Sequence, residues 1–378
     1  MADPVWFWQR IVSPHMAVLA AALAAQGRKV TYVAEQEMSA DRAAQGWHAP
    51  DLGEANLRFA PTVNAVRAAV SDAPETSIHV CQGLRGNGLI GIAQKALAER
   101  GLRQWSIMET IDDSGWRGVL KRMEYRRVIR QWRSKLEGVL AIGHTTPHWL
   151  AACGIPPERI FPFAYFLPES HVQNMPNFDP AAPFRFLYVG QFIERKRVDF
   201  LLDALAKFME VEFEVALIGS GPMETKLRDI ADNKLPGRVK WLGKKPIGEI
   251  PSLMAGADCI VLPSRHDGWG AVLSEALMAG TPAICSDSCG AAGVVQAGGG
   301  AVFPAYDTQA LGDILKGALT AGRQMAEQRK DLAAWARCLN AETGARYLEA
   351  VFTHAQDMTI TVHPTVPWAH VFREQEAK

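Results

Sequence analysis

The sequence has no net charge, few cysteines and no long hydrophobic run. Its 40 basic and 40 acidic side chains cancel, so no overall field draws the protein to nucleic acid. The longest run of small apolar residues, MAVLAAALAAQG, is too short to span a bilayer. The opening MADPVWFWQR has no basic segment ahead of an apolar core, which argues against a secretory leader. We therefore expect a cytoplasmic protein with no nucleic-acid partner.

Cysteine pairs with metal-site spacing are also missing. The six cysteines are scattered along 378 residues, and the closest two, Cys285 and Cys289, have no second ligand pair nearby. A structural zinc site needs such a second pair. We expect reduced thiols with a structural role.

What the sequence does contain is a regular alternation of short apolar runs with longer helical patterns. The first half has KVTYVAE, SIHVCQG and QWSIMET, and the second has FRFLYVGQF, FEVALIGSG, ADCIVLPS and TPAICSD. This alternation predicts βαβ units and parallel sheets. The proline-rich segment FLPESHVQNMPNFDPAAPFRF separates the halves. We predict an α/β protein with two doubly wound domains, residues 1–168 and 183–349, facing a central cleft, and expect residues 350–378 to pack back on the first.

In such sheets ligands bind at the carboxyl ends of the strands, so the loops after the strands are the candidate sites. In VGQFIERKRVD, Arg195 and Lys196 lie at the start of a helix, where free N–H groups favour a diphosphate. In LIGSGP, Gly219 follows a strand and lets the backbone approach a ligand closely. A solvated helix start is the alternative for the two basic residues.

The stretch SRHDGWGAVLSEALMAG places Asp267 in a glycine-rich turn and Glu275 in the helix that follows it. The turn can expose consecutive N–H groups, and a helix from about Ala271 directs its positive end at the same place. Glu275 would accept both hydroxyls of a ribose, and Asp267 would bind the hydroxyls of a sugar. The alternative is that Asp267 caps the helix and Glu275 is a solvated helical residue.

The run from about Phe184 to Leu315 resembles the donor-binding domain of retaining glycosyltransferases with the GT-B fold, glycosyltransferase family 4 ("glycosyl transferases group 1"). The resemblance rests on FLYVGQFIERKRVDFLLDAL, LIGSGPMETKL, VKWLG, ADCIVLPSRHDGWGAVLSEALMAGTPAICSD and GAAG, in family order and spacing. It implies two Rossmann-like domains, the first for the acceptor and the second for the donor. Two positions depart from the family pattern, because Asp267 replaces a glutamate and Gln191 replaces an arginine.

The same resemblance implies transfer of a sugar from a UDP- or GDP-linked donor to an acceptor hydroxyl, with retention at the anomeric carbon, in bacterial glycan, glycolipid or polysaccharide synthesis. The nucleoside diphosphate sugar is a co-substrate, so no cofactor is implied. The absence of an Asp-x-Asp motif predicts that no metal ion is essential. The candidate catalytic residues are Asp267, Lys196 and Glu109. The candidate donor-binding residues are Gly190, Gln191, Arg195, Lys196, Gly219, Gly243, Asp267, Gly268, Trp269, Gly270, Ala271, Val272 and Glu275.

The acceptor side would lie in the first half of the chain, with Ser13, His15, Gly86, Asn87 and Glu109 as candidates. Glu109 ends a strand where many members of the family carry a histidine, and His15 has a capping or packing role as its alternative. The stretch CQGLRGNGLIG also fits a GxGxxG pattern through Gly86, Gly88 and Gly91. A nicotinamide-dependent oxidoreductase is therefore one alternative function, beside a sugar-nucleotide epimerase and a catalytically silent sugar-nucleotide binder.

The segment Arg117 to Lys135 carries eight basic residues and a single acidic one, Glu124. If the segment is helical, Arg122, Arg126, Arg130 and Arg133 share a face, and Trp116, Leu120 and Trp132 are interleaved with them. This pattern predicts contact with an anionic membrane surface or a phosphorylated acceptor, which would make the protein peripheral at the inner face of a membrane. A solvated basic face is the alternative.

Overall fold

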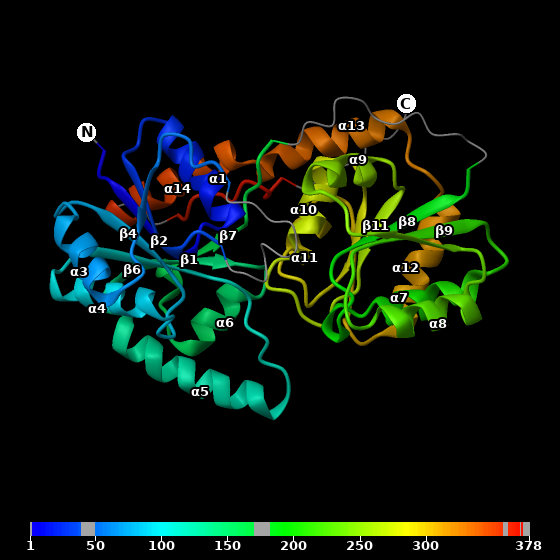
Figure 1. The fold of residues 1–378 in the computed structure, drawn as a ribbon, viewed down its shortest axis with the longest axis horizontal. Coiled ribbons are helices and arrows are strands. Elements are labelled where there is room, and N and C mark those ends of the chain that lie inside the picture. Colours follow the sequence, from blue (N-terminus) through cyan, green and yellow to red (C-terminus); the bar gives the residue numbers. More distant parts are fainter. Residues whose placement is uncertain (1, 39–49, 170–181, 358–361, 371, 373–378) are drawn as a thin grey trace. The chain divides into compact units, whose positions relative to one another are not determined.

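The computed structural model describes residues 2–38, 50–169, 182–357, 362–370 and 372. The chain forms two compact units, drawn in Figure 1. The first comprises Met1–Pro168 and Leu339–Pro367, and the second comprises Glu169–Cys338 and Trp368–Lys378. Each unit contains one parallel sheet with helices packed against it. The predicted α/β architecture is confirmed.

The sheet of the first unit has the strand order β3-β2-β1-β4-β5-β6-β7. Its strands are β1 Val5–Ile11, β2 Val30–Gln36, β3 Asn56–Phe59, β4 Ile78–Gln82, β5 Arg103–Met108, β6 Leu136–Ile142 and β7 Ile160–Phe163. Its helices are α1 Pro14–Ala25, α3 Val63–Asp72, α4 Leu89–Glu99, α5 Gly115–Trp132, α6 Thr146–Cys153 and α14 Ala341–Gln356.

The sheet of the second unit has the strand order β10-β9-β8-β11-β12-β13. Its strands are β8 Phe184–Val189, β9 Phe213–Ile218, β10 Val239–Gly243, β11 Cys259–Leu262, β12 Ala283–Ser286 and β13 Ala301–Phe303. Its helices are α7 Val198–Leu205, α8 Glu224–Lys234, α9 Ile250–Ala255, α10 Ala271–Met278, α11 Ala292–Ala297, α12 Thr308–Ala321 and α13 Ala326–Trp335.

Side-chain caps determine where several helices begin, just after the strands. α1 starts at Pro14, which has no N–H to satisfy, and the Ser13 hydroxyl accepts from the N–H of Met16 at 3.4 Å. α12 starts after Asp307, whose carboxylate accepts from the N–H groups of Gln309 and Ala310. Helix N-termini are thereby directed to the carboxyl ends of the sheets, where ligands bind in this class of fold.

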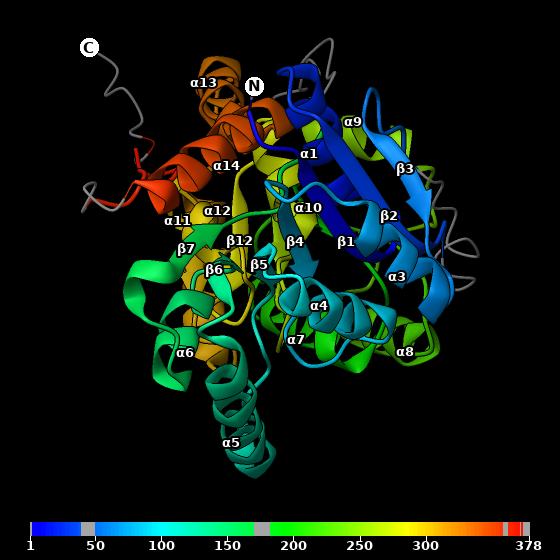
Figure 2. The same cartoon turned by 90° about the vertical axis from the view of Figure 1, so that its left-hand side faces the viewer.

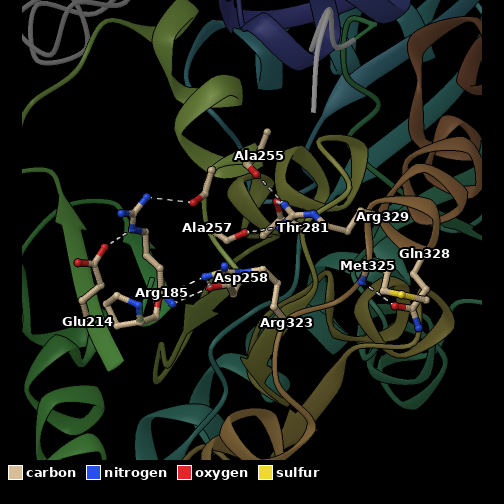
Figure 3. Close-up of polar contacts among 12 residues, drawn as sticks. Arg185, Glu214, Ala255, Ala257, Asp258, Thr281, Arg323, Met325, Gln328 and Arg329 are labelled. Atoms are coloured by element: carbon tan, nitrogen blue, oxygen red, sulfur yellow. Dashed lines mark hydrogen bonds and ion pairs between the residues drawn. The ribbon is translucent and has the colours of Figure 1, made fainter. Parts of the chain in front are cut away.

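A buried polar network fixes the opposite, amino ends of two strands in the second unit (Figure 3). The Asp258 carboxylate, just before β11, accepts from the N–H of Arg185 in β8 at 2.8 Å and from Arg323 Nε at 2.6 Å. Arg329 of α13 donates to the carbonyl oxygen of Ala257 at 2.8 Å. Buried charges are costly unless paired and hydrogen-bonded. The network therefore holds β8, β11 and α13 in one arrangement at the end away from the candidate site.

The positions at which the chain last passes from one unit to the other differ from the domain boundaries expected from the sequence. Leu167 donates its N–H to the carbonyl of Leu339 at 3.0 Å and accepts from the N–H of Ala341 at 2.8 Å. α14 therefore belongs to the first unit from its start, before residue 350. Beyond α14, His363 still stacks on Phe161 of the first unit with ring centroids 4.8 Å apart, as expected. The chain joins the second unit only from Trp368, and there the N–H of Phe372 donates to the carbonyl of Ala297 at 2.7 Å. Backbone hydrogen bonds set both points, and the apolar pattern carries no trace of them.

All six cysteines are free and five are buried, as their scattered spacing predicted. None of the helices in the described ranges combines the length and the hydrophobicity needed to cross a membrane.

Candidate functional site

Bare backbone lines the carboxyl ends of β8, β9 and β10. The N–H of Gly190, directly after β8, donates to the carbonyl of Ile218 at 2.9 Å, and the N–H of Gly219 donates to the carbonyl of Gly243 at 2.9 Å. A Cβ on Gly219 would lie 1.8 Å from the Gly190 oxygen, and the φ of Gly219 is +140°. Only glycine fits there. The structure thus brings these three candidates together on neighbouring strand ends.

Lys196 and Asp267 form an ion pair across the loops after β8 and β11. Lys196 Nζ donates to Asp267 Oδ2, and the two side chains are only 13% and 14% exposed. Two further bonds tie the same loops, because the N–H of Arg265 donates to the carbonyl of Arg195 at 2.7 Å and Arg195 Nη1 donates to the carbonyl of His266 at 3.0 Å. An anion that reaches Lys196 must therefore compete with the Asp267 carboxylate.

The glycine-rich turn is tied to the loop after β12, and the N–H of Asp267 donates to the carbonyl of Ser288 at 3.0 Å. Its carbonyl side is occupied by the loop after β12, since Asp267 accepts from the N–H of Gly290 at 3.0 Å and Trp269 accepts from the N–H of Ala291 at 2.8 Å. Within the part of the chain that the structure describes, no group accepts from the N–H groups of Gly268, Gly270, Ala271 and Val272.

The structure argues against a helix-capping role for Asp267. The N-cap position of α10 is Gly270, in the left-handed conformation at a φ of +85°, and no side chain caps the helix. The carboxylate of Asp267 instead contacts Lys196. The remaining N–H groups and the positive end of the eight-residue helix α10 lie together, an arrangement of the kind that binds anions in other proteins.

Glu275 lies in the second turn of α10 with its side chain partly buried. Loss of hydration raises the pKa of its carboxyl to about 7, well above its ordinary value. Among the described residues nothing donates a hydrogen bond to this carboxyl. A solvated surface residue would have neither property. A desolvated carboxyl that has acceptor capacity left over is a candidate for ligand binding.

Three other donor-side candidates have more limited roles. The Trp269 indole is buried and its Nε1 donates to the Ser274 hydroxyl at 3.2 Å, so only its backbone can reach a ligand. Arg195 is exposed and already contacts a carbonyl. The Gln191 side chain is exposed, and the main-chain carbonyl of Gln191 accepts from the Tyr188 hydroxyl at 2.9 Å.

Gly290 is a site residue that sequence reasoning did not single out. A Cβ on it would lie 2.1 Å from the carbonyl oxygen of Gly268, so only glycine lets the loop after β12 support the turn. Its place in a small-residue run, CGAAG, was the available signal.

In the first unit, Tyr165 connects two of the acceptor-side candidates. Its ring stacks on His15 with centroids 4.7 Å apart, and its hydroxyl donates to Glu109 Oε1. Tyr165 lies shortly after β7 and was missed by the sequence reasoning, although its place beyond a strand end could have indicated it. Ser13 has a structural role, as the N-cap of α1, and its own N–H donates to the Tyr32 hydroxyl at 3.1 Å.

The GxGxxG-like loop before α4 already holds a carboxylate. Glu35 Oε1, from β2, accepts from the N–H of Leu89 at 3.0 Å. A Cβ on Gly88 would lie 3.2 Å from the same oxygen, and one on Gly91 would lie 3.0 Å from Gly86 Cα. A diphosphate placed at this helix start would meet a negative charge, which counts against the oxidoreductase alternative. Beside it, Asn87 Nδ2 donates to a main-chain carbonyl at 3.4 Å.

Over the described ranges, no group of three or more histidine, cysteine or carboxylate side chains is placed to hold a metal ion.

Comparison with known proteins gives the second unit a family context. Residues 176–337, which include Lys196, Asp267 and Glu275, match the family model "Glycosyl transferases group 1". The amylovoran biosynthesis glycosyltransferase AmsK of Erwinia amylovora is 32% identical over 203 residues, 51% of this chain and 50% of that protein. A phosphatidyl-myo-inositol mannosyltransferase of Mycobacterium leprae is 29% identical over 202 residues, 50% of this chain and 52% of that protein. The uncharacterized glycosyltransferase MJ1178 of Methanocaldococcus jannaschii is 32% identical over 100 residues, 26% of this chain and 28% of that protein. The chain thus spans about half, or less, of the length of these relatives.

Solved structures share the fold over most of the chain. The lipopolysaccharide outer core galactosyltransferase WaaB in its apo form has a TM-score of 0.70 at 17% identity, covering 94% of this chain and 100% of that one. Anabaena HepE in complex with UDP and glucose has a TM-score of 0.69 at 16% identity, covering 93% of this chain and 100% of that one. At such identities the likeness shows the fold alone. The GT-B fold implied by the sequence resemblance is confirmed.

Proposed function

We propose that this protein is a retaining glycosyltransferase of family 4, which moves a sugar from a nucleoside diphosphate sugar to an acceptor hydroxyl. The observation that carries the proposal is the juxtaposition of Lys196, Asp267 and the unpaired N–H groups at the start of α10, on the carboxyl ends of β8 and β11. The family match over residues 176–337 supports it independently. In this assignment the second unit binds the donor.

The reaction needs stabilisation of the leaving group. As the bond from the anomeric carbon to the diphosphate breaks, its electron pair stays on the diphosphate oxygen. In this proposal Lys196 and the N–H groups of Gly268 and Gly270 stabilise that charge, which is greatest in the transition state. The acceptor oxygen attacks from the same face and gives its proton to the diphosphate. Asp267 holds the sugar hydroxyls, and Glu275 accepts from the ribose.

Retention is what the family resemblance implies, and the engagement of Asp267 bears only on the route by which it would occur. A covalent mechanism would need a carboxylate free to act as nucleophile, whereas Asp267 is engaged by Lys196. Two structures of one protein that shares the fold guide the choice of donor, since HepE was crystallised with UDP-glucose and with UDP and glucose. UDP-linked sugars are therefore the first donors to test, and GDP-linked sugars the second.

The first unit would bind the acceptor, with His15, Tyr165 and Glu109 as the polar surface that receives its hydroxyl. The acceptor class we propose is a glycan or glycolipid in bacterial polysaccharide synthesis, in keeping with the amylovoran and phosphatidyl-myo-inositol activities named for the two relatives. The protein would act in the cytoplasm, peripheral at the inner face of the membrane where such acceptors are built.

Thermal stabilisation by a panel of UDP-, GDP- and ADP-sugars tests the donor assignment directly. A ligand that binds only the folded protein raises its stability by RT ln(1 + [L]/Kd), about 2.7 kcal/mol at a hundredfold excess over Kd. We expect one nucleotide series to raise the unfolding temperature and NAD(H) to leave it unchanged. Stabilisation by NAD(H) and by no sugar nucleotide would contradict the proposal. Release of the nucleoside diphosphate from the stabilising donor, even at a slow rate, would indicate an enzyme. No release would indicate a catalytically silent binder.

A further inference from the structure

The helix α5 has one face packed in the first unit, and no described residue covers its opposite face. Its inward residues, Gly118, Tyr125 and Ile129, are buried, and the Tyr125 ring meets that of Trp149 in α6 edge to face at 4.7 Å. In Figures 1 and 2 the helix lies beyond α6, at the outside of its unit. Packing against α6 therefore determines which side of α5 faces outward.

Large apolar side chains occupy the first half of the outward face. The exposed fractions are 70% for Trp116, 49% for Val119, 55% for Leu120 and 62% for Met123. These residues are three or four positions apart, so they form one continuous stripe on the helix. Isolated exposed apolar residues are ordinary, but a contiguous group of this size marks an interaction surface.

Arginines continue the same stripe in the second half of the helix. Arg127 and Arg130 are exposed, and in the described part of the chain neither has an ion pair or hydrogen bond. By contrast, Arg122 pairs with Asp113 at 2.5 Å, and Arg126 donates to the carbonyl of Ala152 at 3.3 Å. The predicted basic face is therefore displaced, because the arginines nearer the protein are held by local partners while Arg127 and Arg130 remain available.

We propose that the outward face of α5, made of Trp116, Val119, Leu120, Met123, Arg127 and Arg130, is a docking surface for an anionic lipid bilayer. The apolar half would enter the boundary between headgroups and acyl chains, and the arginines would contact lipid phosphates at the same depth. Charge complementarity selects a bilayer with anionic lipids. A nucleic acid offers phosphates but no apolar layer for Trp116 and Met123. The surface does not depend on transferase activity, so its failure and that of the proposed function are distinguishable.

Sedimentation of the full chain with vesicles tests this surface. We expect binding to vesicles of equal parts phosphatidylglycerol and phosphatidylcholine and little binding to phosphatidylcholine alone. Each arginine near an anionic surface contributes about fivefold in affinity, so the double change Arg127→Glu, Arg130→Glu should weaken binding by about 25-fold or more. The matched control is Arg67→Glu, Lys95→Glu, which reverses two exposed charges on α3 and α4 and should leave binding unchanged.

The apolar half has its own test. Trp116→Gln, Met123→Gln should also weaken vesicle binding, whereas Ile247→Gln, at an exposed apolar position of the second unit, should not. Quenching by lipids brominated on the acyl chains should be larger for the native chain than for Trp116→Phe. The proposal fails if the native chain ignores anionic vesicles at low salt. It also fails if the α3 and α4 control weakens binding equally, or if a DNA oligonucleotide binds as tightly and is insensitive to the Trp116 variant.

Discussion

At the scale of single residues, the ion pair of Lys196 with Asp267 is the contact of the proposed donor site that is simplest to test. We expect Lys196→Ala to weaken nucleoside diphosphate binding by roughly 1.5–3 kcal/mol, about 10- to 150-fold, because a charge-assisted contact is lost. Titration calorimetry with the stabilising nucleotide measures this. The control is Lys234→Ala, which removes an exposed ion pair with Asp203 in the same unit. Equal affinities in all three proteins would make Lys196 merely the partner of Asp267.

Glu275 should show opposite effects on stability and on binding. Its pKa of about 7 in the folded protein exceeds the ordinary value of 4.5, so the folded state holds a proton that the unfolded state has lost. The contribution of this group to stability is therefore present below about pH 4.5 and is lost as pH rises toward about 7. Glu275→Gln should raise the free energy of unfolding at pH 8 by on the order of 2 kcal/mol, and yet weaken nucleotide binding.

Chemical denaturation at pH 5 and pH 8 measures the first effect, and calorimetry measures the second. Affinity for a nucleoside diphosphate sugar should rise in the native protein as pH rises through about 7, because only the ionised carboxyl accepts from both ribose hydroxyls. The rise should vanish in Glu275→Gln. A variant that is stabilised but binds normally would place the ribose elsewhere.

Some residues of the candidate site could be predicted from the sequence, and others could not. Lys196, Asp267 and Glu275 could be chosen in advance because each follows an apolar strand closely, and strand ends gather at one edge of a parallel sheet. Tyr165 and Gly290 had only weak signals, a place beyond a strand end and a small-residue run. Their roles depend on contacts with Glu109 and with the carbonyl of Gly268, which only the folded structure shows. The pairing of Lys196 with Asp267 itself is a tertiary event that spacing does not encode.

At the scale of elements, the close approach of the loops after β8 and β9 depends on Gly219. A methyl group there would overlap the carbonyl of Gly190 at 1.8 Å, so Gly219→Ala must push two loops apart. We expect the free energy of unfolding to fall by more than about 3 kcal/mol, and nucleotide binding to be lost as well. Gly317→Ala, in α12 with nothing within 4 Å of the new methyl, should be neutral or stabilising by up to about 1 kcal/mol. Denaturant titration of both variants decides the matter.

Strand β4 carries a buried histidine that should make the first unit sensitive to acid. Nδ1 of His79 accepts from Trp8 Nε1 at 3.0 Å, so Nε2 carries the proton toward the Ser77 hydroxyl at 2.9 Å. Burial, with a smaller effect of Arg100, lowers the pKa of His79 from 6.5 to about 3. Between about pH 6.5 and pH 3 the unfolded state therefore binds a proton that the folded state does not bind. The free energy of unfolding falls as pH drops through this range.

We expect this histidine to account for about 2 kcal/mol of destabilisation between pH 7 and pH 4.5. His79→Asn should be less stable at pH 7 but should lose less stability on acidification. His148→Asn, at an exposed position, should keep the native pH dependence. If the acid slope is the same in all three proteins, other groups control it.

Elements were easier to predict than their connections. Runs such as FEVALIGSG and ADCIVLPS are apolar on both faces, which is what a strand in a two-sided parallel sheet requires, and they became β9 and β11. The assignment of α14 to the first unit was not predictable in the same way. Two backbone hydrogen bonds of Leu167 lead the chain back to the first unit, and such bonds carry no sequence signature. The apolar face of α14 predicts a packed helix but does not say which sheet it covers.

At the scale of the whole molecule, the donor assignment predicts where a nucleotide should slow hydrogen exchange. Protection should concentrate in residues 190–197 and 264–275 of the second unit, because the candidate ligand contacts lie in those loops. The sheet of β1 to β7 should change little by direct contact. Exchange measured by mass spectrometry with and without the stabilising nucleotide tests this. Protection centred on residues 83–91 would revive the oxidoreductase alternative.

The chain returns to the first unit only after most of the second has been made, and this sets an order for folding during synthesis. α14 packs on α1 and on the turn after it, where Arg28 pairs with Glu349 at 3.0 Å. It also packs on β5, where the ring centroids of Phe352 and Trp105 are 5.2 Å apart. When β1 to β7 leave the ribosome, that partner does not yet exist, so an apolar surface of the nascent chain stays uncovered. Residues 169–338 meanwhile have every strand of their own sheet. The unit encoded second is therefore the first to complete its sheet and helices, and the unit encoded first must wait, exposed to aggregation or chaperone capture, until the final helix arrives.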